Sequence, residues 1–380
     1  MTDKVLGVGI IGCGNISTTY LQLAPLFRNI ELRAVADISR EAAEARGTEF
    51  GLRVQSVADI LRNPAVQIIV NLTVPAVHYK VTKQCLLAGK HVYSEKPLTL
   101  TLAEAKDLQK TAAKMKLHVA AAPDTFLGGS HQLIRKLIDD GAIGKVASGT
   151  AHILSQGMEH WHPNPDFFFK PGGGPILDMG PYYIANLINL IGPVKRVAAL
   201  SATPRKTRVI SSAPRKGQKI SVKTPTTYHA LLHFANGAAV TLTASWDVYA
   251  NRHQPMEIYG TEGAIFVPDP NFFGGDVMMA GSDAQLQKAK MWDHPFTPAN
   301  WKDHEGNTWP NYRAAGLADM AVGILKKRDI RCDIARMAHV VDIMTAIHAS
   351  GETGRFIDLT TTCTRPRALG PEEARSLLKP

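Results

Sequence analysis

The chain has 380 residues, with 45% hydrophobic and 20% charged side chains and a formal net charge of +10, values typical of a globular protein that divides into two domains. No apolar run reaches the roughly 18 residues of a membrane-spanning helix, and the first residues lack the pattern of a secretory signal. The four cysteines are widely separated and lack CxxC spacing, which argues against disulfides and thiolate zinc, so we expect a cytoplasmic protein with no membrane partner.

The first segment, residues 4–37, has the pattern of strand, glycine turn, helix, strand and acid. Residues 5–11 are almost wholly apolar, as in a buried parallel strand, and lead into Gly12-Cys13-Gly14-Asn15-Ile16-Ser17. Glycines at this spacing let backbone N–H groups approach a pyrophosphate at a helix N-terminus. After a second apolar run at 31–36, Asp37 stands where a carboxylate takes the ribose hydroxyls of NAD.

The glycine motif could instead be placed at Gly7, Gly9 and Gly12, but this leaves only two apolar residues before the turn, too few for a strand. NAD is favoured over NADP because a 2′-phosphate would meet the Asp37 carboxylate, although Arg40 is near enough to accept such a phosphate. The predicted dinucleotide site therefore comprises Gly12, Gly14, Asn15, Ile16, Asp37 and Arg40.

Strand and helix patterns go on alternating as far as residue 122, which predicts a doubly wound parallel sheet. Helices are expected after the N-cap signals at Ser56 and Thr101. Further strands are expected at 66–72, 91–94 and 117–122. We therefore predict a Rossmann dinucleotide-binding domain over residues 1–122.

The pattern changes after Pro123, where extended runs joined by turns become more frequent than helices. A helix is expected at 130–140, hairpins at 227–245 and 257–267, and two more helices at 314–325 and 335–349. These elements predict an α+β domain over 123–380 with a large, mostly antiparallel, open-faced sheet, which would bind substrate and form a homodimer or homotetramer. Residues 269–310, rich in Gly, Pro, Asn and Trp, form a long excursion of a kind that is often functional.

The positive charge is concentrated between Lys195 and Lys223, which hold nine Lys or Arg residues and no Asp or Glu. A nucleic-acid site would need interleaved aromatic residues or a recognition motif, and this segment has neither, so we expect no nucleic-acid partner. Three interpretations stay open: a solvated hairpin, an oligomer contact, or a basic wall that steers an anionic substrate.

Three further motifs narrow the class of Rossmann protein. They are Thr73-Val74-Pro75-Ala76-Val77-His78, Ala88-Gly89-Lys90-His91-Val92-Tyr93-Ser94-Glu95-Lys96-Pro97 and Gly172-Gly173-Gly174-Pro175-Ile176-Leu177-Asp178-Met179-Gly180. Together with the first segment, they resemble the glucose–fructose oxidoreductase/inositol dehydrogenase (Gfo/Idh/MocA) family over essentially the whole chain. The resemblance implies an α/β protein that uses NAD(P) to oxidise a ring secondary alcohol of a sugar, glycoside or cyclitol.

The resemblance also implies roles for residues of the second motif. Lys96 would lie beside the nicotinamide and transfer the proton, its pKa lowered by the positive ring and by burial. The Lys96–Pro97 bond is a candidate for the cis form. Thr73, His78 and Glu95 would also lie close to the cofactor.

The third motif departs from the family at one position. The family usually places an Asp and a His four residues apart against the reacting hydroxyls, whereas this chain has Asp178 and Tyr182. At this spacing both side chains would share one face of a helix. An unperturbed Tyr titrates near about 10 and a His near about 6.5, so we expect Asp178 to anchor the substrate and Tyr182 to assist Lys96. The alternative is a purely structural role for Tyr182.

Other candidate pocket residues lie near the third motif and after the last Rossmann strand. His152, His160 and His162 do not have a firm metal-ligand spacing, and hydride transfer needs no metal, so no metal is expected. Trp161 is expected to stack on a sugar face or on the bound nicotinamide, and His162 to form a hydrogen bond with a hydroxyl. Asp124 is a further substrate-binding candidate.

Two other functions remain compatible with these residues. Some relatives are NAD-dependent glycosidases, which oxidise the sugar transiently, eliminate the aglycone, add water and return the hydride without net NADH. The family's galactose-pathway corepressor shows that a non-catalytic sensor is also possible, although retention of Lys96 and Asp178 argues against it.

Overall fold

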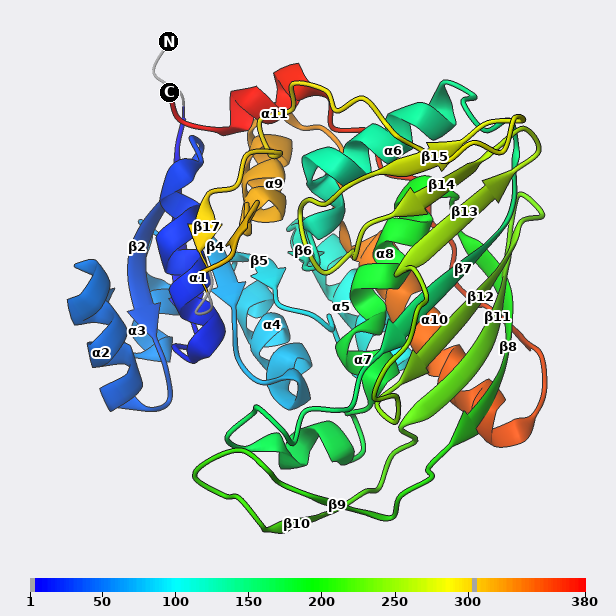
Figure 1. The fold of residues 1–380 in the computed structure, drawn as a ribbon. Coiled ribbons are helices and arrows are strands. Elements are labelled where there is room, and N and C mark those ends of the chain that lie inside the picture. Colours follow the sequence, from blue (N-terminus) through cyan, green and yellow to red (C-terminus); the bar gives the residue numbers. More distant parts are fainter. Residues whose placement is uncertain (1–3, 303–305) are drawn as a thin grey trace.

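The computed structural model describes residues 4–302 and 306–380 and contains two large sheets, shown in Figure 1. The first is a six-stranded parallel sheet of order β3-β2-β1-β4-β5-β6. Its strands are β1 (Leu6–Ile11), β2 (Ile30–Ala36), β3 (Arg53–Val54), β4 (Ile68–Asn71), β5 (His91–Ser94) and β6 (Val119–Ala121). This order confirms the predicted doubly wound sheet. Because the strands are parallel, the turns after β1, β4 and β5 all lie at its carboxyl edge.

Helices connect these strands, as parallel pairing requires. They are α1 (Asn15–Leu23), η1 (Ala24–Leu26), α2 (Arg40–Phe50), α3 (Val57–Arg62), η2 (Pro75–Val77), α4 (His78–Leu87) and α5 (Leu102–Met115). Both expected N-caps are present. Ser56 Oγ accepts from Asp59 N at 3.0 Å, and Thr101 forms a reciprocal capping box with Glu104. Local sequence signals therefore set where these helices begin.

The second sheet has nine strands in the order β16-β15-β14-β13-β7-β12-β11-β8-β19. They are β7 (Val146–Leu154), β8 (Val194–Ala202), β11 (Thr227–Phe234), β12 (Ala239–Ser245), β13 (Met256–Gly260), β14 (Ala264–Val267), β15 (Met278–Ala280), β16 (Gln287–Lys288) and β19 (Ile357–Asp358). The pairs are antiparallel except β7 with β12, which run parallel. The prediction of a mostly antiparallel sheet is confirmed.

One face of the nine-stranded sheet packs on helices and the other is open, as Figure 1 shows. The helices of this half are η3 (Thr125–Leu127), α6 (Gly129–Asp139), η4 (Pro165–Phe169), α7 (Pro175–Asp178), α8 (Gly180–Leu190), α9 (Ala315–Lys326), α10 (Ile334–Thr353) and α11 (Pro371–Leu377). Alternate residues of β11 are buried, because a strand turns successive side chains to opposite faces. Leu200, Leu231 and Phe356 are exposed apolar residues. All three line a shallow hollow on the open face.

The basic segment forms strand β8 and then a hairpin of β9 (Thr207–Val209) and β10 (Lys219–Ser221) at the lower edge of Figure 1. Arg208 is buried and forms ion pairs with Glu159 at 2.6 Å and Asp247 at 2.5 Å. Arg215 pairs with Asp166. Part of the positive charge therefore holds the hairpin to η4, to the loop before η4 and to the residues after β12.

The excursion from 269 to 310 contains β15 and β16 and then a short ribbon of β17 (Trp301–Lys302) and β18 (Thr308–Trp309). In the view of Figure 1 the ribbon overlaps the first sheet, and Arg313, which follows the ribbon, donates to Glu95 after β5.

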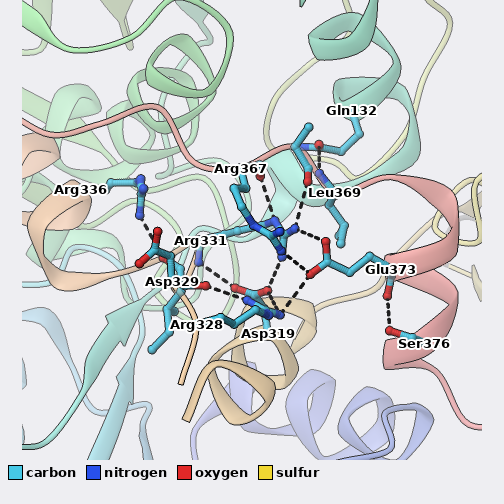
Figure 2. Close-up of polar contacts among 12 residues, drawn as sticks. Gln132, Asp319, Arg328, Asp329, Arg331, Arg336, Arg367, Leu369, Glu373 and Ser376 are labelled. Atoms are coloured by element: carbon cyan, nitrogen blue, oxygen red, sulfur yellow. Dashed lines mark hydrogen bonds and ion pairs between the residues drawn. The ribbon is translucent and has the colours of Figure 1, made fainter. Parts of the chain in front are cut away.

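A buried ion-pair network anchors the C-terminal helix (Figure 2). Asp319 on α9 is fully buried and accepts from Arg328 at 2.7 Å and from Arg331 Nη1 at 2.5 Å. Arg331 Nη2 in turn donates to Glu373 on α11 at 2.6 Å. The chain then returns to the first domain, where Lys379 N donates to Leu26 O at 2.8 Å.

Among the described residues, none of the helices combines the length and apolar character that crossing a bilayer requires.

Candidate active site

The glycine turn after β1 has the geometry that a dinucleotide phosphate needs. Gly12 has a φ of +105°, and a Cβ there would lie 2.5 Å from the carbonyl carbon of Leu72, so only glycine fits. A Cβ on Gly14 would meet nothing within 4 Å, and Gly14 and Asn15 are both exposed. Helix α1 begins at Asn15, and its N-cap, Gly14, provides no side-chain cap, so an anion could take that place beside Asn15 and Ile16.

Asp37 closes this turn from the end of β2. Its Oδ2 accepts from Cys13 N at 2.7 Å and its Oδ1 accepts from Ser39 N at 2.8 Å, which fixes the carboxylate beside the glycine turn. Arg40 instead pairs with Glu44 at 2.6 Å on its own helix, so it is not held at Asp37. The adjacent Ile38 is fully exposed. Sequence reasoning missed this residue, whose apolar surface suits the face of an adenine ring.

Lys96 joins the two halves of the molecule. It follows β5, and its Nζ donates to Asp178 Oδ1 at 2.9 Å and to the Asp178 carbonyl at 2.7 Å. Asp178 ends α7 in the second half of the chain. The Lys96–Pro97 bond is cis, as the resemblance implied.

Tyr182 is the third member of this cluster. The Lys96 ammonium lies 5.2 Å from the centre of the Tyr182 ring, within the range of a cation–π contact. The expectation that Asp178 and Tyr182 share one helix is wrong, because α7 ends at Asp178 and Tyr182 lies in α8. Pro181 lacks the N–H that would continue α7, and the new helix begins one residue earlier, at Gly180. Both side chains nevertheless reach Lys96.

The pKa of Lys96 differs from the expectation. Burial lowers it, as anticipated, but the Asp178 carboxylate, with Tyr182 and Glu95, outweighs burial and raises the pKa above its ordinary value. Lys96 is therefore an ammonium group in this state of the protein.

Glu95 lies directly behind Lys96 and connects three elements. It is buried, its Oε1 accepts from Tyr20 at 2.9 Å and from Arg313 Nη1 at 3.0 Å, and its Oε2 accepts from Lys96 N at 2.9 Å. Burial raises the pKa of Glu95, but Arg313 and Lys96 outweigh burial and keep it below its ordinary value. Sequence reasoning missed Arg313, which lies more than two hundred residues from Glu95 and carries no local motif.

His78 has a different place from the one implied by the resemblance. It is buried, with Nδ1 2.7 Å from Pro97 O and Nε2 2.8 Å from Thr73 O. Burial lowers its pKa. His78 thus ties the loop after β4 to the loop after β5 and leaves no ring nitrogen for a cofactor. Thr73 is partly exposed beside it, with its hydroxyl on Asn71.

Asp124 is also not a pocket residue. It is fully buried, and its Oδ2 accepts from Ala314 N at 3.1 Å and Gly316 N at 3.0 Å, so it holds the start of α9. Trp161 and His162 lie on the loop before η4, where Trp161 is exposed and its ring meets His162 edge-on at 5.3 Å. Burial lowers the pKa of His162, and the Asp178 carboxylate opposes this effect.

The described residues contain no cluster of three or more side chains able to hold a metal ion.

Two family models account for most of the chain. The NAD-binding Rossmann fold of the GFO/IDH/MocA oxidoreductases matches residues 6–122, and the C-terminal domain of the same family matches residues 131–266. The chain belongs to this family. It is therefore an oxidoreductase with an NAD-binding Rossmann fold, and the open glycine turn and Asp37 fit that cofactor.

Individual relatives are distant. An uncharacterized oxidoreductase of Schizosaccharomyces pombe is 28% identical over 43% of this chain, and the match spans only 47% of that protein. Levoglucosan dehydrogenase of Pseudarthrobacter phenanthrenivorans is 26% identical over 68% of this chain and 73% of that protein. The structure of a levoglucosan dehydrogenase with NADH has a TM-score of 0.80 at 22% identity, covering 94% of this chain and 100% of that one; at this identity the likeness shows the fold.

Proposed function

We propose that the protein is an NAD-dependent dehydrogenase of a ring secondary alcohol in a sugar, glycoside or cyclitol. The observation that carries this proposal is the cluster of Lys96, Asp178 and Tyr182, which two segments of the chain bring together after β5. When bound, NAD accepts the hydride, and its positive ring opposes the effect of Asp178 on the pKa of Lys96. Relatives named as D-xylose, levoglucosan and myo-inositol dehydrogenases support the substrate class.

The side chains divide the work as follows. Lys96 exchanges a proton with the reacting hydroxyl of the substrate. Its Nζ can carry that proton, and it lies next to both Asp178 and Tyr182. Asp178 accepts a hydrogen bond from a substrate hydroxyl and keeps the ammonium in place. Tyr182 holds the ammonium over its ring and offers its hydroxyl as an assistant. Glu95 and His78 position the Lys96–Pro97 turn from behind.

The charges of this cluster favour an uncharged substrate over an anionic one. Lys96 is paired with Asp178, and Arg313 is paired with Glu95 at 3.0 Å. The four formal charges therefore balance, and a carboxylate or phosphate entering the site would compete with an existing partner of either cation.

Incubation of the purified protein with NAD and a panel of sugars, glycosides and cyclitols tests the proposal. A dehydrogenase accumulates NADH with at least one of them. A redox glycosidase releases the aglycone without net NADH, and a sensor binds sugar without turnover; either result contradicts the proposal.

We also propose that the open face of the nine-stranded sheet joins two copies of the chain. Leu200, Leu231 and Phe356 are 71%, 53% and 66% exposed there, an arrangement suited to a self-complementary contact. Leu231→Glu should then shift the molecular mass measured by sedimentation toward that of the monomer.

A further inference from the structure

The ribbon of β17 and β18 presents two indoles on one side. Trp301 pairs directly with Trp309 across the antiparallel ribbon, and residues directly opposite each other in such a pair project from the same face. Phe272, from the turn after β14, stacks on Trp309 with ring centres 5.3 Å apart and planes inclined by 25°. Three aromatic rings thus meet at one place in the excursion that the sequence marked as unusual.

These rings line a pocket of about 310 Å³ together with Phe273, Pro310 and four polar residues. Asn271, Asn307, Asn311 and Arg313 supply the polar groups. Phe272 and Trp309 are each 38% exposed, so ring surface remains open at the pocket. Aromatic faces with a few amides around them match the chemistry of a sugar ring, which offers an apolar C–H face and hydroxyls at its rim.

The pocket adjoins the catalytic cluster without containing it. Arg313 lines the pocket and donates to Glu95, whose neighbour in the chain is Lys96. Lys96, Asp178 and Tyr182 are not among the lining residues, and neither is any residue of the glycine turn. The Glu95 carboxylate balances the charge of Arg313, so the pocket suits an uncharged group.

We propose that this pocket is a subsite for a second, uncharged sugar ring of the substrate, which makes the substrate a glycoside with at least two units. The proposal rests on the dehydrogenase function above, since the first ring would occupy the Lys96 cluster. Trp301 would then be a specificity-determining residue, because it contributes stacking to the second ring and nothing to the reacting one.

Binding to the NADH-loaded protein tests the subsite without turnover. Calorimetric titrations would compare cellobiose with methyl β-D-glucoside, xylobiose with methyl β-D-xyloside, and lactose with methyl β-D-galactoside. At least one disaccharide should bind about three- to tenfold more tightly than its methyl glycoside. Trp301→Leu should remove this gain, whereas Leu286→Ala, at an exposed apolar residue of the same excursion, should keep it.

The outcomes separate the two proposals. If none of the disaccharides binds more tightly than its methyl glycoside, or if Trp301→Leu keeps the gain, the subsite is wrong even when NADH forms from simple sugars. If Trp301→Leu weakens NADH binding instead, the pocket serves the cofactor and the subsite is again wrong. If the disaccharide gain is present but no sugar yields NADH, the subsite stands and the dehydrogenase proposal fails. Phe272→Leu serves as the second variant if Trp301→Leu does not fold.

Discussion

Lys96 Nζ lies 2.9 Å from Asp178 Oδ1, and this contact joins the carboxyl end of a Rossmann strand to a helix of the second half of the chain. The cluster that we propose to be catalytic therefore draws on both halves of the chain. The same contact determines the protonation of Lys96, since the Asp178 carboxylate opposes the effect of burial and raises the pKa of the ammonium. In the proposed mechanism, the bound cofactor and substrate therefore lower the pKa of Lys96 before it accepts a proton.

Tyr182→Phe tests the assistant role. The variant keeps the ring that faces the Lys96 ammonium at 5.2 Å and loses only the hydroxyl. One hydrogen bond is worth about 0.5–1.5 kcal/mol, more if charge-assisted, so kcat/KM should fall about two- to thirtyfold. Tyr182→His should remain active with a lower pH optimum. An unchanged Tyr182→Phe enzyme would make Tyr182 structural, and an inactive one would make its hydroxyl the principal acid or base.

Asp37→Ala tests the ribose contact. The carboxylate lies at the end of β2, fixed by Cys13 N and Ser39 N, where a 2′-phosphate would be repelled and ribose hydroxyls accepted. The dissociation constant of NAD should therefore rise more than that of NADP. Melting temperature controls for the two lost backbone contacts. Equal losses for both cofactors, or none, would contradict the assignment.

Three buried histidines should make the protein less stable in acid. Burial lowers the pKa of His131, His294 and His339 from 6.5 to about 4. As the pH falls, these histidines bind protons in the unfolded chain at a higher pH than in the folded protein. Their contribution to the free energy of unfolding should therefore be constant above pH 6.5 and fall between pH 6.5 and 4. The loss at pH 5.5 is about 1 kcal/mol for each histidine.

Urea unfolding measured across this pH range checks the effect. His339→Gln should flatten the pH dependence, since it removes one titrating group, whereas His233→Gln, at an exposed residue, should leave it unchanged. If the free energy of unfolding depends on pH in the same way in His339→Gln as in the wild type, groups other than His339 govern the stability in acid.

Asp319→Ala should be strongly destabilising, because it removes the fully buried carboxylate that pairs with both Arg331 and Arg328 and leaves Arg331 with Glu373 alone (Figure 2). Removing one partner of a buried pair costs about 3–5 kcal/mol of unfolding free energy. Asp358→Ala breaks an exposed pair with Arg196 and should cost less than about 1 kcal/mol. Similar losses in the two variants would show that the network contributes little.

Contiguous residues predicted much of the fold and the cofactor turn. An apolar strand followed by Gly12, whose backbone admits no Cβ, is a local signal, and so are the caps at Ser56 and Thr101. The turn at Gly180-Pro181 was also readable as a helix start, and overlooking it led to the single helix expected for Asp178 and Tyr182.

The burial of individual side chains, and their contacts with residues far away in the sequence, could not be predicted from such local signals. Asp124 follows a strand, as pocket residues often do, but its partners Ala314 and Gly316 come from a distant segment and cover it. His78 is enclosed by the cis turn at Pro97. The pairing of Glu95 with Arg313 likewise depends on tertiary packing, so no spacing in the sequence indicated it.

The most direct test of the central claim is the rate of NADH formation by Lys96→Met, measured on the best substrate of the panel together with the dissociation constant of NAD. Methionine keeps most of the side-chain volume and removes the proton carrier. General acid–base groups contribute about 10²–10⁴-fold, so the rate should fall by at least about a hundredfold while NAD still binds. A variant that keeps more than about a tenth of the wild-type rate would show that the proton leaves by another route.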